Sequence, residues 1–237
     1  LYGRLWDPHA PWVLYLRMLW ELYGLHLDDE NPHVRTGLSL TRFQADGVTR
    51  MERLLDEHGG VLVADEVGLG KTYLAGEVIY RTANVNRQRV LIVAPAALKT
   101  SMWEPFLRTH DFSRWVQVYS YEEVRNRLDP SHHGHHAFMQ EIEDYALVVI
   151  DEAHNLRNSS AQRSGAVDRV ITTGGQPKRV VLLTATPVNN SLADLETLVK
   201  YFIRDDARFA SLGIPSIREY IKHAQAIDPA NLTPEHL

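Results

Sequence analysis

Three short segments carry the residue types that nucleotide chemistry requires. They are DEVGLGKT (65–72), DEAH (151–154) and TATPVNN (184–190). In the first segment, Gly70, Lys71 and Thr72 match the end of a phosphate-binding loop of the pattern GxxxxGKS/T. Asp65 stands where that pattern has its first glycine, which leaves open the class of ATPase to which such a loop would belong.

The phosphate loop has the local context that it needs. An apolar run precedes it and a helix-like stretch follows it, so backbone N–H groups at the helix N-terminus would face the phosphates. We expect Lys71 to neutralise the β- and γ-phosphates of ATP and Thr72 to ligate Mg²⁺. The other nucleotide contacts expected along the loop are Glu66, Val67, Gly68, Leu69, Gly70 and Tyr73.

Two adjacent acids, Asp151 and Glu152, follow the apolar stretch 146–150. Carboxylates at a strand end suit magnesium-dependent phosphoryl transfer. We expect Asp151 to hold Mg²⁺, directly or through water, and Glu152 to orient and deprotonate the attacking water. The alternative is an acidic helix N-terminus, which the helix dipole would stabilise. The presence of the lysine loop in the same chain favours the catalytic interpretation.

A third strand-end segment begins at Thr184. We expect the hydroxyls of Thr184 and Thr186 to contact the acidic pair or His154 and so to couple the two segments. The alternative is an ordinary turn with a capping residue before a helix that starts near Ser191.

The elements that must position these segments alternate along the chain. Apolar runs occupy 61–64, 89–94, 115–119, 146–150 and 179–184, and helix-like stretches lie at about 41–57, 71–83, 97–108, 137–143, 162–172 and 191–203. This pattern predicts an α/β fold with a parallel sheet covered on both faces. Ligands bind such folds outside the carboxyl ends of the strands, where all three segments lie.

Composition bounds the class of protein. The 237 residues are 44% hydrophobic and 23% charged, as expected for a globular domain with a packed core. The absence of cysteine excludes a disulfide framework and a thiolate metal site and fits a reducing compartment, here expected to be the cytoplasm. The net charge of −5 means that nucleic-acid binding must depend on a local patch. The sequence begins without methionine and is interpreted as a piece of a longer protein.

Two other segments favour structural interpretations. The most apolar segment, 11–24, is too short to span a bilayer, and a packing helix is favoured over a membrane-surface helix. The loop 129–136 reads DPSHHGHH, but no acidic or cysteine ligand stands at a defined spacing beside the histidines. A solvated loop is therefore favoured over a metal site.

Taken together, the three segments resemble the first motor lobe of superfamily-two helicases, and most closely the Swi/Snf-type group. That group carries aspartate at the position of Asp65, so the resemblance explains this departure from the general loop pattern. Residues 40–48 (LTRFQADGV) resemble the glutamine motif of the group, which implies that Gln44 touches adenine. Further resemblances lie at 90–106, 119–124 and 182–202, although Ala185 stands where the group more often has glycine.

The resemblance implies a three-layer RecA-like P-loop fold over residues 38–204, with a helical lead-in at 1–37 and a helical tail at 205–237. It implies an ATP-dependent enzyme that moves on duplex DNA. A strand-separating DNA or RNA helicase and a nucleotide-gated regulatory module remain as alternatives. The lead-in resembles bacterial helicases that carry a phospholipase-D-like domain. No motif after residue 203 resembles the second lobe, which supplies the arginines that complete catalysis, so the 237 residues alone are expected to be inactive.

Candidate nucleic-acid contacts follow from the motif at 90–106, whose loop faces nucleic acid in the family. Lys99, Thr100 and Ser101 are the expected contacts, because hydroxyls and a lysine near a helix start bind backbone phosphates without reading sequence. Trp103 lies beside them, but a core position is favoured for it. Arg125 and Arg127 are weaker candidates that a solvated helix face explains equally well.

Overall fold

The computed structural model describes residues 37–64, 70–112, 114–156, 161–187 and 193–203, together with Ser216 and Glu219. Its five strands form one sheet in the order β1-β5-β4-β2-β3, and all neighbours are parallel. The strands are β1 (Gly60–Val63), β2 (Arg89–Ala94), β3 (Val116–Ser120), β4 (Tyr145–Ile150) and β5 (Arg179–Leu183). Each strand lies within one residue of the apolar run that predicts it, which confirms the α/β class.

Helices connect the strands. They are α2 (Arg42–His58), α3 (Lys71–Tyr80), α4 (Ala96–Leu98), α5 (Glu104–Thr109), α6 (Tyr121–Arg127), α7 (His135–Glu143), α8 (Ala161–Thr172) and α9 (Ala193–Val199). Wider π-helical turns extend α3 over Arg81–Val85 and join α4 to α5 over Lys99–Trp103. The stretch predicted as one helix over 97–108 is therefore an irregular helix of three parts.

Helix α6 is the element that the hydrophobic pattern does not predict. It is two turns long, too short for a 3.6-residue period to stand out. It begins at a capping box in which the Ser120 hydroxyl accepts from the Glu123 backbone N–H, while the Glu123 carboxylate accepts from the Ser120 N–H. This local signal lies within the stretch that is recognised as a family motif.

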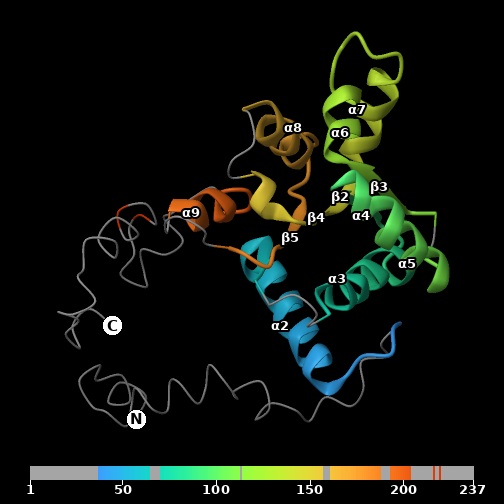
Figure 1. Ribbon diagram of the computed structural model, residues 1–237, viewed down its shortest axis with the longest axis vertical. Helices are drawn as coiled ribbons and strands as arrows, with labels where there is room; N and C mark the ends of the chain where they lie inside the picture. Colours follow the sequence, from blue (N-terminus) through green and yellow to red (C-terminus); the bar gives the residue numbers. More distant parts are fainter. Residues whose placement is uncertain are drawn as a thin grey trace.

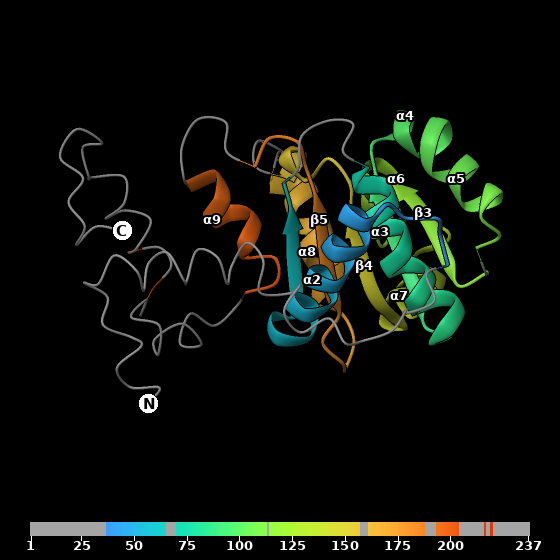
Figure 2. The same ribbon diagram turned by 90° about the horizontal axis from the view of Figure 1, so that it is seen from below.

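The pleat of the strands divides the core into two halves. On β2, Leu91 and Val93 pack with α6, α7, α8 and α9 on one face, whereas Val90 and Ile92 pack with α2, α3 and the segment around Trp103 on the other. Figure 1 shows the first group of helices in its upper half and α2, α3 and α5 below, and Figure 2 gives the view from below. The sheet lies between two helical layers, as the RecA-like prediction requires.

Backbone hydrogen bonds extend past the strand ends and fix the edge at which the predicted site lies. The Asp151 N–H donates to Val93 O at 2.8 Å, and the Thr184 N–H donates to Val63 O at 3.1 Å. Both residues are thereby held at the carboxyl edge of the sheet.

Residues 1–36 and nearly all of 204–237 lie outside the described residues, so the boundaries of the lead-in and tail stay predictions. Among the described helices, none has the length and hydropathy to cross a membrane.

Candidate active site

Gly70 turns the chain into α3. Its φ of +85° lies in the left-handed region that glycine adopts without steric cost. Its carbonyl accepts hydrogen bonds from the N–H groups of Tyr73 at 2.8 Å and Leu74 at 3.1 Å, so the helix begins at Lys71, as predicted. The expected loop contacts Glu66, Val67, Gly68 and Leu69 lie outside the described residues.

The structure brings Gln44 next to the end of the phosphate loop. Gln44 belongs to the capping box of α2: its side-chain oxygen accepts from the Thr41 N–H at 3.0 Å, and its own N–H donates to the Thr41 hydroxyl at 3.3 Å. The amide nitrogen Nε2 of Gln44 then lies so close to Gly70 that a methyl group on Gly70 would overlap it. The glutamine motif and the phosphate loop therefore meet in space.

Asp151 is a buried carboxylate at the end of β4, with 7% of its surface exposed. Its Oδ2 accepts from the Trp103 indole Nε1–H at 2.8 Å, and its Oδ1 accepts from the Glu152 backbone N–H at 2.9 Å. Burial raises the pKa of Asp151 above the ordinary aspartate value, and these two donors and the charge of Lys71 lower it in part. Lys71 and Asp151, eighty positions apart, are thus electrostatic neighbours.

The residues at this edge fit a magnesium ion. Hard cations prefer oxygen ligands, and a carboxylate oxygen that already accepts one hydrogen bond keeps a further lone pair. Asp151 offers such oxygens. Among the described residues, the Thr72 hydroxyl donates to the Met102 sulfur at 3.4 Å, a weak acceptor that a stronger ligand can replace.

Glu152 has a strained backbone. Its φ of +50° is uncommon for a residue with a side chain and costs about 1–3 kcal/mol. Asn155 holds the turn, because its backbone N–H and its side-chain Nδ2 each donate to Glu152 O at 2.9 Å. A single 3₁₀ turn over Ala153–Leu156 follows. The acidic pair therefore does not simply open a regular helix, which was the alternative interpretation.

The side chain of His154 connects the acidic pair to the third segment. Its Nδ1 lies 3.0 Å from Glu152 Oε2 and 3.4 Å from the Thr184 hydroxyl. The Thr184 hydroxyl in turn accepts from the Thr186 N–H at 3.1 Å. The predicted contact between the threonine segment and His154 is present, and the same threonine also stabilises its own turn.

The predicted nucleic-acid contacts already have protein partners. Lys99 Nζ forms a 2.7 Å ion pair with Glu123, and the hydroxyls of Thr100 and Ser101 donate to Ala97 O at 3.2 and 2.7 Å. Contact of these three residues with nucleic acid stays a prediction. Trp103 is fully buried, which confirms its core position and removes it from the nucleic-acid candidates.

The histidine loop shows contacts of an ordinary surface turn. His132 and His133 stack with ring centroids 4.4 Å apart, and His135 Nδ1 lies 3.2 Å from Arg127 O. Within the part of the chain that the structure describes, no group of three or more His, Asp or Glu side chains is arranged to hold a metal ion.

Two aromatic residues that were not predicted to take part in the site support it. The Trp103 indole holds Asp151, and the buried Tyr121 hydroxyl donates to Asp151 O at 2.7 Å. A buried indole or phenol needs a partner for its polar hydrogen, so a core assignment for Trp103 already implies a nearby acceptor. The identity of that acceptor is not readable from the sequence.

Comparisons with known proteins find similarity to ATP-dependent helicases. Residues 106–210 match the SNF2-related domain. The chain is 30% identical over 198 residues to the probable ATP-dependent DNA helicase CHR12 of Arabidopsis thaliana, covering 73% of this chain and 17% of that protein. It is 33% identical over 150 residues to the ATP-dependent helicase YqhH of Bacillus subtilis, covering 60% of this chain and 26% of that protein.

A solved structure shares the fold. The SWI2/SNF2 ATPase core of Sulfolobus solfataricus in complex with dsDNA superimposes with a TM-score of 0.56 at 21% identity, over 70% of this chain and 36% of that one. This chain therefore corresponds to a limited part of each of these longer proteins.

Proposed function

This chain carries an SNF2-related domain and is homologous to Swi/Snf-type ATP-dependent helicases, and on that premise we propose that it is the ATP-binding first lobe of a DNA-dependent translocase. In this role the lobe binds Mg-ATP at the carboxyl edge of its sheet. The protein to which it belongs couples ATP hydrolysis to movement along duplex DNA.

One observation supports this proposal most strongly: Lys71 begins α3 directly after the phosphate loop, Asp151 is buried at the end of β4, and the charge of Lys71 lowers the pKa of Asp151. A lysine and an acid at the carboxyl edge of one parallel sheet, here after β1 and β4, form the pair that binds phosphate and its counter-ion. Asp151 and Thr72 would hold Mg²⁺, which neutralises charge on the phosphates when bound. Lys71 binds the β- and γ-phosphates from the helix side.

In this proposal Glu152 is the general base. Its backbone adopts a left-handed conformation, so the chain does not continue into a regular helix at this residue. Its carboxylate oxygen Oε2 lies 3.0 Å from His154 Nδ1. A base must be held within reach of the water that it deprotonates. The contact of His154 with Thr184 ties that base to the end of β5, so displacement of the threonine segment would alter the position of Glu152.

Duplex DNA is the partner that we propose. The homologous core of Sulfolobus solfataricus is described in complex with dsDNA. The net charge of −5 does not attract nucleic acid globally, so binding would depend on a local surface of this lobe and on the rest of the protein.

The test is an ATPase assay on the full-length protein with duplex DNA, single-stranded DNA or RNA. We expect duplex DNA to stimulate turnover, and we expect no strand separation in a parallel displacement assay. Stimulation accompanied by strand separation would make the protein an unwinding helicase instead. Turnover that no nucleic acid stimulates would favour a nucleotide-gated regulatory module.

A further inference from the structure

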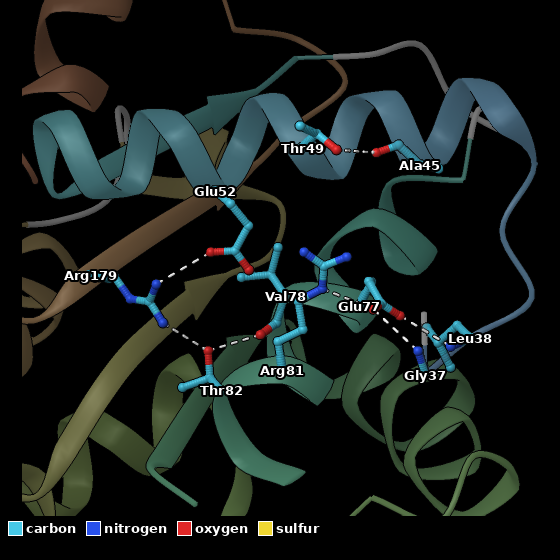
Figure 3. Close-up of polar contacts among 10 residues, drawn as sticks. All are labelled: Gly37, Leu38, Ala45, Thr49, Glu52, Glu77, Val78, Arg81, Thr82 and Arg179. Carbon is cyan, nitrogen blue, oxygen red and sulfur yellow. Dashed lines mark hydrogen bonds and ion pairs between the residues drawn. The ribbon is translucent and has the colours of Figure 1, made fainter. Parts of the chain in front are cut away.

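A fully buried carboxylate lies in the second turn of α3, the helix that follows the phosphate loop. Glu77 has no exposed surface. Its two oxygens accept hydrogen bonds from the backbone N–H groups of Gly37 at 3.2 Å and Leu38 at 3.1 Å, and Oε1 also accepts from Arg81 Nε at 3.0 Å. Figure 3 shows this cluster, with Glu77 between Arg81 and the chain segment at Gly37 and Leu38.

Because the Glu77 carboxylate is buried, the fold depends on its hydrogen-bond partners. A buried charge is tolerated only when it is paired and its lone pairs are used, and removal of a partner from such a group is costly. The Glu77 carboxylate has one guanidinium and two backbone donors. The backbone segment 37–38 is therefore bound to α3 by hydrogen bonds that water does not replace.

The neighbouring Gly76 makes room for the same segment. A methyl group on Gly76 would lie 3.0 Å from Leu38 Cδ1 and 2.6 Å from Phe106 Cζ. Leu38 is 3% exposed, so its side chain is packed against α3 while its N–H is held by Glu77. Gly76 thus leaves space for the Leu38 side chain, and Glu77 binds the Leu38 backbone N–H.

The bound segment leads directly to the glutamine motif. Thr41, three positions after Leu38, caps α2 and orients Gln44, and Gln44 Nε2 lies against Gly70. We propose that Glu77 is a positioning residue for the base-recognition side of the nucleotide site: by holding residues 37–38 on α3, it sets the place of Gln44 relative to the phosphate loop. This inference rests on the proposed ATP-binding function.

A second polar cluster, farther along α2, provides a matched control. Glu52 on α2 accepts from Arg179 Nη1 at 3.4 Å, and Arg179 Nη2 donates to the Thr82 hydroxyl at 3.0 Å (Figure 3). Burial raises the pKa of Glu52, and the nearby Arg179 and Arg81 lower it in part. Glu52→Gln removes one acidic charge near α3 without touching the segment at Gly37 and Leu38.

The experiment is calorimetric titration of the 237-residue chain with Mg-ATP and, separately, with Mg-tripolyphosphate, which lacks adenine and ribose. In Glu77→Gln we expect the affinity for Mg-ATP to fall about tenfold, while the affinity for tripolyphosphate changes less than about twofold. In Glu52→Gln we expect both affinities to be unchanged. An equal loss for both ligands in Glu77→Gln, or no loss for either, would overturn the positioning role. Failure of the unmodified chain to bind either ligand would instead reject the proposed nucleotide site and this inference with it.

A second measurement does not depend on folding of the variant. In the unmodified chain, the Leu38 amide hydrogen should exchange with solvent at least about 100-fold more slowly than in an unstructured peptide. Exchange at the unstructured rate would mean that Glu77 does not hold the segment, and would overturn the proposal.

Discussion

The indole Nε1–H of Trp103 donates a 2.8 Å hydrogen bond to Oδ2 of Asp151, and both side chains are buried. The bond joins the π-helical turn after β2 to the acidic end of β4. A tryptophan that contributes a large apolar surface to the core thus also fixes the rotamer of the proposed magnesium ligand. Packing of the core and geometry of the site are linked through this one contact.

Replacement of Trp103 by phenylalanine tests that link. The aromatic body is largely kept, but the carboxylate loses a charge-assisted hydrogen bond, which we expect to lower the free energy of unfolding by about 1.5–3 kcal/mol at pH 7. The smaller ring adds a packing cost. Urea unfolding of both proteins measures the difference.

The destabilisation in Trp103→Phe should depend on pH. The indole bond favours the charged carboxylate and so opposes the rise that burial causes in the pKa of Asp151. Loss of the bond therefore raises the pKa of Asp151 further. The penalty is fully present above the folded pKa of the variant and shrinks as the pH falls and Asp151 becomes protonated. A penalty that stays constant while the pH falls through the range in which Asp151 becomes protonated would show that only packing was lost.

Gly70→Ala should impair both stability and nucleotide binding. The φ of +85° costs a residue with a side chain about 1–2 kcal/mol, and the new methyl group would displace the Gln44 amide. Gly165→Ala is the control, because Gly165 lies in α8 and, outside its own helix backbone, no atom of the described residues lies within 4 Å of the added methyl. We expect that control to gain about 0.5–1 kcal/mol. Thermal unfolding and Mg-ATP titration give the comparison, and equal behaviour of the two variants would contradict the assigned geometry.

Lys71→Ala should weaken Mg-ATP binding without unfolding the chain. The loss of a charge-assisted contact with the phosphates is expected to cost about 1.5–3 kcal/mol of binding free energy. Lys200→Ala, on the exposed end of α9 where Lys200 pairs only with Glu196 among the ion pairs of the described residues, serves as the charge-matched control. Calorimetric titration measures both, and an affinity for Lys71→Ala equal to that of the control would remove Lys71 from the site.

Glu152→Gln should separate binding from chemistry. The amide keeps the shape of the side chain but cannot accept a proton from water. In the full-length protein we expect normal Mg-ATP affinity and a turnover rate reduced by about 10²–10⁴-fold. Steady-state phosphate release measures the rate. Unreduced turnover would show that Glu152 is not the general base.

The 237-residue chain alone is expected to bind Mg-ATP and to hydrolyse it negligibly, with or without duplex DNA. The resemblance assigns the arginines that neutralise charge on the γ-phosphate to a second lobe, and such an arginine contributes about 10³–10⁵-fold in related phosphoryl-transfer enzymes. A phosphate-release assay beside the full-length protein measures this. Robust turnover by the chain alone would show that an arginine within it completes the site.

The sequence by itself determined the sheet and the chemical types at its carboxyl edge. Strands buried on both faces must be nearly continuous apolar runs, so each run predicts a strand to within one residue. The lysine loop, the acidic pair and the threonine segment each follow such a run, and parallel strands necessarily bring their carboxyl ends to one edge. The hydrophobic pattern did not reveal α6, because a two-turn helix has too little periodicity, although the capping box Ser120–Glu123 at its start is a local sequence signal.

Only the tertiary structure decided which distant groups meet. Trp103 and Asp151 are 48 positions apart in the sequence, and Glu77 accepts a hydrogen bond from the backbone N–H of Gly37, 40 positions away. The amphipathic pattern specifies that a side chain is buried, but not which donor or acceptor it will meet, since that depends on how the helices pack across the sheet. A buried tryptophan and a buried glutamate both require polar partners, and the packing of α3 and of the segment after β2 against the sheet supplied those partners.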